Sequence, residues 1–266
     1  MGFSWRKLLT TARATLGGES AAAPIVIESR DVADEGSPLG GGIETFDTPE
    51  AGAINRARLA HLDSLGLPLS SKRVLDVGCG VGHHGAFYAE RGCSVLCVDA
   101  REENIRALRR RYPQLEAHVA DVETDDLSRL GNFDIVHCYG LLYHLENPLA
   151  ALRNIAAVCQ GILLLETIVC DHPMALLRIE DETLSSNQAL GGLGCRPSPG
   201  FVAMALNRIG FPFVYAPRRV PDHEDFAFER LGNLDTRRDG HNLRCVFVGS
   251  KAALSLDGLK PLVRSP

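Results

Sequence analysis

Several features common to large protein classes are missing from this sequence. The formal net charge is −5 at pH 7, so the chain has no overall attraction for nucleic acid or for an anionic membrane. No apolar run reaches the length of a membrane-spanning helix, and residues 1–18 lack the uninterrupted apolar core of a signal peptide. The eight cysteines show no CxxC spacing, which excludes the common zinc motifs and favours packed, reduced thiols. We therefore expect a cytoplasmic protein that does not bind a membrane.

The chain does contain an alternation of strand patterns and helical patterns. With 266 residues, of which 45% are hydrophobic, it can form one large domain. The expected strands cover 73–79, 94–99, 116–120, 133–139, 161–168, 211–215 and 244–250. The expected helices cover about 49–66, 84–91, 102–112, 147–158 and 199–209. Such alternation is typical of an α/β fold with a doubly wound, mostly parallel sheet.

The most informative stretch is VLDVGCGVGHHGAFYAERGCSVLCVD, residues 74–99. A buried strand runs into the glycine turn Gly78-Cys79-Gly80-Val81-Gly82, a helix follows, and the next strand ends on Asp99. Glycines let the backbone turn sharply and approach a ligand closely, and a carboxylate at the end of the second strand can bind a ribose diol. This arrangement predicts a site for a cofactor that contains adenosine.

The glycines alone do not identify that cofactor, because Gly80-x-Gly82-x-x-Gly85 also fits the dinucleotide pattern. Asp76 favours a different ligand. It lies two residues before the first glycine, where it would repel a pyrophosphate and attract the amino group of S-adenosylmethionine. Asp121 follows the third strand, where it can accept a hydrogen bond from an adenine amino group. We therefore prefer S-adenosylmethionine to NAD.

The segment LDVGCGVG, followed by VDA and AD, resembles the motifs of class I S-adenosylmethionine-dependent methyltransferases. The resemblance implies a Rossmann-like sheet of seven strands whose last strand is antiparallel. By position it implies that the cofactor is bound by Arg58, Asp76, Gly78, Cys79, Gly80, Asp99, Ala100, Asp121, Val122, Cys138 and Tyr139. In this set Arg58 would hold the cofactor's carboxylate and Asp99 its ribose.

Methyl transfer to a hydroxyl requires alignment of two atoms and removal of a proton. His144 follows the 133–139 strand, whose carboxyl end borders the cofactor crevice, so it is the expected general base. The alternative is that His144 only braces the next helix. Glu166, at the end of the fifth strand, is the second catalytic candidate. His83 and His84 are expected beside the cofactor or in solvent, and His137 in the core.

The expected organisation has three parts. Residues 1–50 hold a short helix at 4–16 and a flexible lid, residues 51–255 form the methyltransferase domain, and residues 256–266 form a tail. The stretches 169–198 and 218–243 exceed ordinary connections, so they are expected either to build an acceptor pocket or to decorate the surface. The candidate acceptor-binding residues are Tyr143, Asn187, Arg196 and His223.

The acceptor is less well defined than the cofactor. YGLLYHLENPLAAL with LLLETIV resembles the bacterial tRNA wobble-uridine carboxymethyl transferase, which uses carboxylated S-adenosylmethionine. INRARLAHLDSLGLPL with NQALGGLGCRPSPGFV is similar to bacterial O-methyltransferases of sugars and polysaccharides. A saccharide hydroxyl is the preferred acceptor, and the alternatives are tRNA, another small hydroxylated metabolite, or cofactor binding without catalysis.

The remaining expectations concern a metal and a partner. Asp121, Glu166, Asp171 and His172 have no recognised metal-binding spacing, so no metal is expected. The expected partners are a small molecule and a second copy of the chain.

Overall fold

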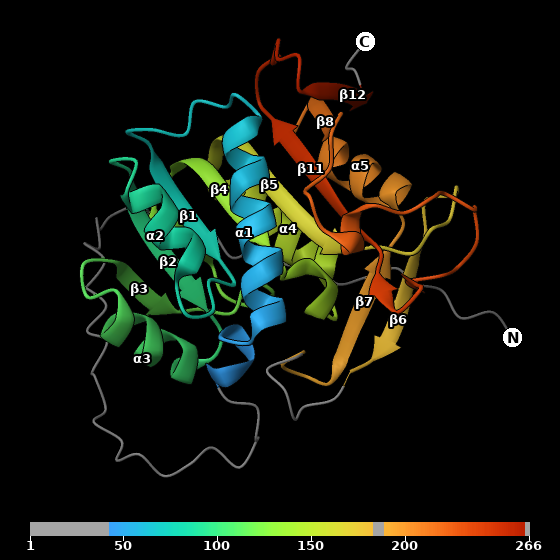
Figure 1. Ribbon diagram of the computed structural model, residues 1–266. Helices are drawn as coiled ribbons and strands as arrows, with labels where there is room; N and C mark the ends of the chain where they lie inside the picture. Colours follow the sequence, from blue (N-terminus) through green and yellow to red (C-terminus); the bar gives the residue numbers. More distant parts are fainter. Residues whose placement is uncertain (1–42, 183–188, 264–266) are drawn as a thin grey trace, which may run out of the picture. The chain divides into compact units, whose positions relative to one another are not determined.

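The computed structural model describes residues 43–182 and 189–263 (Figure 1). The expected helix at 4–16, residues 30–42 of the expected lid and Asn187 lie outside the described residues. Within the described ranges, no helix combines the length and the apolar character needed to cross a bilayer.

The centre of the fold is a sheet with the strand order β12-β8-β11-β5-β4-β1-β2-β3. Its strands are β1 (Arg73–Val77), β2 (Ser94–Asp99), β3 (Glu116–Val119), β4 (Phe133–Tyr139), β5 (Cys159–Ile168), β8 (Phe213–Pro217), β11 (Arg244–Ser250) and β12 (Leu259–Val263). The first five are parallel, whereas β11 is antiparallel to both β5 and β8. The predicted α/β fold with an antiparallel strand at 244–250 is therefore confirmed.

The sheet has eight strands, one more than the sequence predicted. The additional strand, β12, pairs antiparallel with β8 and lies within the segment expected to be a tail. Leu259 is buried there, and Pro261 is compatible with an edge strand because such a strand has neighbours on one side only. The segment Leu-Lys-Pro-Leu-Val was not predicted as a strand because it is short and contains a proline, which disfavours a strand interior.

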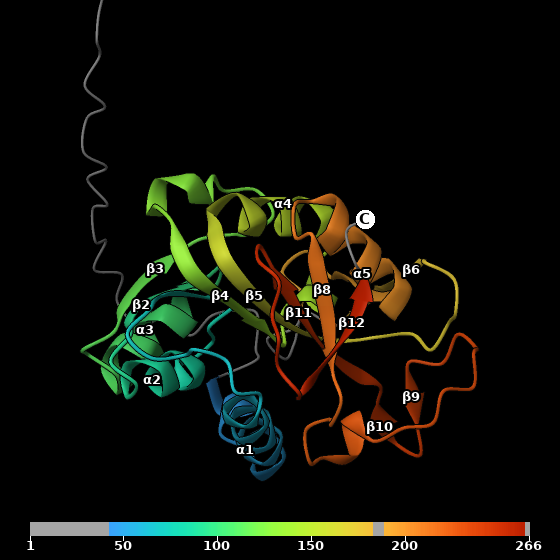
Figure 2. The same cartoon turned by 90° about the horizontal axis from the view of Figure 1, so that it is seen from above.

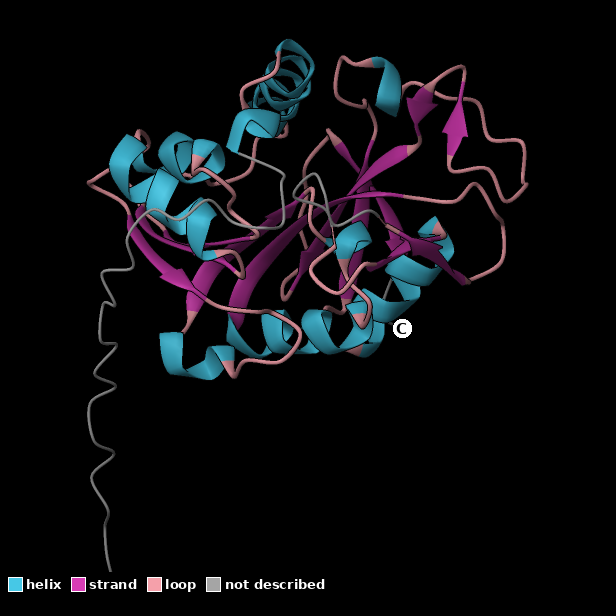
Figure 3. Ribbon diagram, turned by 90° about the horizontal axis from the view of Figure 1, so that it is seen from below, coloured by secondary structure: helices cyan, strands magenta, loops and turns pink. Residues whose placement is uncertain are grey.

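Helices cover both faces of the sheet (Figures 2 and 3). One side carries α1 (Pro49–Ser64), α2 (His83–Ala89) and α3 (Glu102–Arg111), and the other carries α4 (Pro148–Val158) and α5 (Pro199–Arg208). Two apolar clusters follow this division. Leu62, Tyr88 and Leu108 belong to the first, and Leu152 and Leu206 belong to the second. Burial of a Leu or Phe side chain contributes about 1.5–3 kcal/mol, so these clusters are the main source of stability.

The two long stretches contain small sheets of their own. In 169–198, β6 (Leu177–Asp181) pairs antiparallel with β7 (Leu193–Pro197). In 218–243, β9 (Arg237–Arg238) pairs with β10 (His241–Asn242). Short 3-10 turns are η1 (Ile43–Phe46), η2 (Leu127–Leu130), η3 (Leu142–His144) and η5 (Glu224–Phe226). Figure 1 shows β6 and β7 beyond the carboxyl end of β5, where the catalytic side chains were expected.

Candidate functional site

A cavity of about 740 Å³ opens at the carboxyl ends of β1, β2 and β4. Its wall is formed by η1, α1, the glycine turn, the segment after β4 and residues 223–244. Parallel α/β sheets bind their ligands at this edge, and the volume is within the range of small-molecule sites. This is the edge of the sheet at which the sequence predicted the cofactor site.

The glycine turn has a backbone that a side chain would obstruct. Gly78 has φ +65°, and a Cβ atom there would lie 2.9 Å from the Leu141 side chain. Gly80 has φ +52°, and a Cβ atom there would lie 2.7 Å from the Phe46 ring of η1. Gly78 and Cys79 line the cavity, whereas Gly80 lies beneath Phe46. This turn is therefore a close-fitting cradle rather than a flexible loop.

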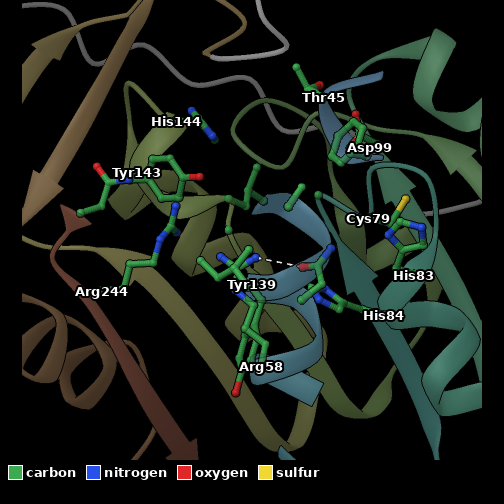
Figure 4. A pocket seen from close by; sticks show the side chains of 18 of the residues that line it. Thr45, Arg58, Cys79, His83, His84, Asp99, Tyr139, Tyr143, His144 and Arg244 are labelled. Carbon is green, nitrogen blue, oxygen red and sulfur yellow. Dashed lines mark hydrogen bonds between the residues drawn. The ribbon is translucent and has the colours of Figure 1, made fainter. Parts of the chain in front are cut away.

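Asp99 connects the glycine turn to the start of α3. Its Oδ2 atom accepts from the Gly80 N–H at 3.0 Å, and its Oδ1 atom accepts from the Arg101 N–H and the Asn104 amide at 2.9 and 3.0 Å. Burial raises the pKa of Asp99, although these three donors act in the opposite direction. The carboxylate lines the cavity, as a ribose-binding acid would (Figure 4).

The adjacent wall carries the residues expected around adenine. Ala100, Asp121 and Val122 all line the cavity, next to Asp99. The Asp121 carboxylate accepts from the Glu123 N–H at 2.9 Å and from the Thr124 hydroxyl at 3.0 Å. It is therefore held in a fixed orientation by the turn that follows it.

Asp76 and Cys138 lie behind the cavity wall and not on it, which corrects the expectation of direct cofactor contact. Asp76 is 1% exposed, and Gly85 of α2 packs against its carboxylate. Burial raises the pKa of Asp76 to about 8, with the Gly85 N–H opposing and the charge of Asp99 reinforcing this shift. Cys138 is fully buried in the sheet, whereas its neighbour Tyr139 does line the cavity. Because α2 packs over the end of β1, it separates Asp76 from the ligand space.

His144 lies on the cavity wall at the end of η3, as the sequence predicted. Its Nδ1 atom lies 2.6 Å from Oε2 of Glu182. Burial raises the pKa of Glu182, but the hydrogen bonds and charges of His144 and Arg196 outweigh it and bring the pKa to about 2. The carboxylate is therefore ionised and accepts a hydrogen bond from the Nδ1–H group, which leaves Nε2 of His144 with a free lone pair. Burial lowers the pKa of His144, so the ring is neutral at pH 7.

Glu182 is the functional candidate that sequence reasoning missed. It is held by Arg196, whose Nη2 donates to Oε1 at 2.7 Å and whose Nη1 donates to the Tyr143 carbonyl at 3.0 Å. Arg196 does not line the cavity, so its expected contact with the acceptor is corrected to a bracing role behind Glu182. The pairing of β6 with β7 brings Glu182 to His144, so a sequence analysis that predicted this pair of strands would have identified Glu182.

Glu166 is fully buried and does not line the cavity, contrary to expectation. Its Oε2 atom accepts from Nη2 of Arg58 at 2.5 Å, and its Oε1 atom accepts from Nη1 of Arg244 at 3.1 Å. The Nε atom of Arg244 also donates to Asp225 at 2.9 Å. Both arginines line the cavity, so Glu166 positions two cationic side chains and does not meet a ligand itself. Arg244 was missed because it begins an otherwise apolar strand.

The outer part of the cavity is polar and contains two of the expected acceptor-binding residues. Tyr143 lies beside Arg244, with the guanidinium carbon 5.1 Å from the ring centroid (Figure 4). His223 and His241 face the same space, and Nδ1 of His241 lies 3.5 Å from Oδ1 of Asp225. The 218–243 stretch therefore contributes a wall to the cavity and is more than surface decoration.

Comparisons with known proteins agree with this architecture. A family model described as a methyltransferase domain matches residues 52–215. A tRNA U34 carboxymethyltransferase of Idiomarina loihiensis is 32% identical over 184 residues, which cover 66% of this chain and 54% of that protein. A ubiquinone biosynthesis O-methyltransferase of the same organism is 28% identical over 184 residues, which cover 56% of this chain and 76% of that protein. The chain thus spans about half the length of its tRNA-modifying relative.

A solved structure has the same fold and contains a bound product of the expected cofactor. The N-terminal domain of EvdMO1 with SAH bound is 25% identical, covers 74% of this chain and 80% of that chain, and has a TM-score of 0.55. The glycine cradle and the acid at the end of β2 fit S-adenosylmethionine, which is the cofactor. The chain belongs to the methyltransferase domain family, with S-adenosylmethionine as its cofactor.

Proposed function

We propose that this chain is an O-methyltransferase that methylates a hydroxyl group of a saccharide. The observation that carries the proposal is a neutral histidine, His144, held by an ionised carboxylate on the wall of the cofactor cavity. S-adenosylmethionine supplies the electrophilic methyl group, and the chain's own residues must orient the acceptor and take its proton.

Two groups of residues would hold the cofactor. The cradle at Gly78 and Cys79 lets its methionine part approach the backbone, and Asp99 lies where a ribose diol would donate to a carboxylate. Arg58 is placed for the cofactor's carboxylate, because its guanidinium lines the cavity and Glu166 fixes its orientation. These roles agree with the spacing of the motif along the chain.

The proton transfer follows from the geometry of His144. With Nδ1 donating to Glu182, Nε2 is the acceptor for the hydroxyl proton, which would pass to it as the oxygen bonds to the methyl carbon and the bond from that carbon to the cofactor's sulfur breaks. Glu182 stabilises the imidazolium that results, and Arg196 keeps that carboxylate ionised. General-base assistance of this kind contributes roughly 10²–10⁴ in rate.

The outer cavity supports a polyhydroxylated acceptor. His223, His241 and Asn242 offer donors and acceptors at several positions, which suits a sugar with several hydroxyls. Arg58 and Arg244 form ion pairs with Glu166 and Asp225, which balance their positive charges. This part of the wall therefore does not require an anionic acceptor.

Transfer of a carboxymethyl group to tRNA is the second candidate. It is favoured by the 32% identity to the tRNA U34 carboxymethyltransferase of Idiomarina loihiensis. Arg244 beside Tyr143 would be the group to contact a carboxylate on the transferred carbon. The formal net charge of −5 weighs against an RNA acceptor.

The test is product mass spectrometry after incubation with methyl-labelled cofactor and separate pools of saccharides, phenols and tRNA. We expect labelled saccharide, with turnover reduced roughly 10²–10⁴ in His144→Ala while cofactor affinity is kept. His118→Ala, a substitution on the exposed side of β3, is the matched control and should keep its activity. Label in tRNA alone, or unchanged turnover in His144→Ala, would contradict the proposal.

A further inference from the structure

Three side chains from different elements meet behind the glycine turn. Asp76 of β1 and His137 of β4 are register partners on adjacent parallel strands, so their side chains leave the same face of the sheet. Helix α2 covers that face, and its His84 ring lies 4.7 Å from the His137 ring, centroid to centroid. One ligand atom from each of the three side chains lies within 4.8 Å of the other two.

Each of the three side chains has a buried polar atom that has no hydrogen-bond partner among the described residues. These atoms are Oδ2 of Asp76, Nε2 of His84 and Nε2 of His137. A buried polar atom without a partner is destabilising, so three of them in one small group of side chains require an explanation. A ligand shared by all three would satisfy them together.

Hydrogen bonds hold two of these side chains in place. The Tyr88 hydroxyl lies 3.0 Å from Nδ1 of His137, and the Gly85 N–H donates to the Asp76 carboxylate. Outer hydrogen bonds of this kind orient ligands at metal centres, where they fix the ring nitrogen that faces the ion. The orientation of these two side chains is thereby fixed.

We propose that Asp76, His84 and His137 bind one divalent transition-metal ion of the Zn²⁺ or Co²⁺ type. Two imidazole nitrogens and one carboxylate oxygen suit these ions, whereas Mg²⁺ and Ca²⁺ prefer oxygen ligands. With metal–ligand bonds of about 2.0–2.2 Å, tetrahedral ligand atoms lie roughly 3.3 Å apart, so the site needs only a modest contraction. The ion reaches it through the cavity, because His84 also lines that cavity.

Tyr139 lies next to this site. Its ring centroid is 4.2 Å from that of His137, and its buried hydroxyl has no partner among the described residues. The hydroxyl, or a water that it holds, is suited to the fourth coordination position. An ion here would join β1 and β4 to α2, which are the elements that set the glycine turn, and would stabilise the folded chain.

The test is titration of the metal-free, full-length chain with Co²⁺ alone, followed by visible absorption and calorimetry. We expect one ion per chain, with the strong visible bands of a four- or five-coordinate Co²⁺ centre. His84→Ala should lower the affinity at least tenfold, and Zn²⁺ should raise the Tm of the wild type but not of this variant. His83→Ala is the matched control, because His83 is adjacent in α2 but bonds to Arg111 instead.

Several outcomes would overturn the site. Binding no tighter in the wild type than in His84→Ala, or an equal loss in His83→Ala, would show that the ion lies elsewhere. A thiolate charge-transfer band would assign the ion to nearby Cys79 and Cys97. Circular dichroism shows whether each variant folds. If His84→Ala does not fold, Asp76→Asn, which keeps the side-chain shape, tests the metal site instead. Retained Co²⁺ affinity in Asp76→Asn would also refute the ligand set.

Discussion

Replacement of Glu182 by Gln tests the catalytic geometry most directly. Gln keeps the shape of the side chain but removes the negative charge 2.6 Å from Nδ1 of His144. A hydrogen bond to a charged group contributes about 1.5–3 kcal/mol, and that stabilisation is needed most when the ring becomes an imidazolium. Because about 1.36 kcal/mol corresponds to a tenfold change in rate, kcat should fall about 10- to 150-fold.

The pH profile gives the same substitution a second readout. The base must be neutral, so the rate is full above the pKa of His144 and falls as the pH drops through it. Burial lowers this pKa from 6.5, whereas Glu182 acts to raise it. In Glu182→Gln the pKa therefore falls further, and the acid limb of kcat should move to lower pH. A role confined to folding would reduce the amount of active protein without moving the limb.

The assay is initial-rate kinetics with methyl-labelled cofactor and the saccharide acceptor from pH 4.5 to 8, together with cofactor titration. Asp181→Asn is the matched control, because Asp181 is the exposed last residue of β6 and directly precedes Glu182. The reasoning is refuted if kcat in Glu182→Gln stays within a factor of two of the wild type, or if its acid limb moves to higher pH.

Three further predictions use different parts of the molecule. Asp99→Ala should weaken S-adenosylmethionine binding by roughly 2–4 kcal/mol, because a buried diol loses a charged acceptor; unchanged affinity by calorimetry would remove Asp99 from the site. Gly78→Ala should lower the free energy of unfolding in urea by about 1–3 kcal/mol, because φ is +65° and the new Cβ atom would lie 2.9 Å from Leu141. A variant as stable as the wild type would show that the turn relaxes freely. The pKa of Glu182 falls from 4.5 to about 2 on folding, so the stability that it contributes is full above about pH 4.5 and is lost toward pH 2. The difference in unfolding free energy between wild type and Glu182→Gln should therefore shrink over that range, and a constant difference would contradict the ionised pair.

The sequence predicted the elements that depend on local pattern. The core strands end within two residues of the expected positions, because Val, Ile and Leu runs between glycine and polar turns are rarely anything else. Thr48 and Ser198 begin α1 and α5 by accepting from backbone N–H groups, with Pro at the first helical position. Asp99 and His144 were predicted as site residues because each lies at or after the carboxyl end of a strand, and both line the cavity.

What the sequence did not predict depends on contacts between distant residues. Leu259–Val263 forms a strand only because β8 presents an open edge. Glu182 reaches His144 through the pairing of β6 with β7, which no local apolar pattern indicates. The sequence also did not show how deeply two other side chains are buried. Asp76 lies near the end of β1 but is covered by α2. Glu166 lies near the end of β5 but is covered by Arg58 and Arg244.

Two of the carboxylates that contact His144 and Arg244 come from separate backbone segments, Glu182 from 169–198 and Asp225 from 218–243. Neither segment belongs to the glycine turn or to the strand that ends on Asp99. Changes in either segment therefore leave the glycine turn and Asp99 in place, because connecting segments tolerate variation better than the elements that they join. Grafting 218–243 from a homologue should transplant acceptor preference without transplanting cofactor preference.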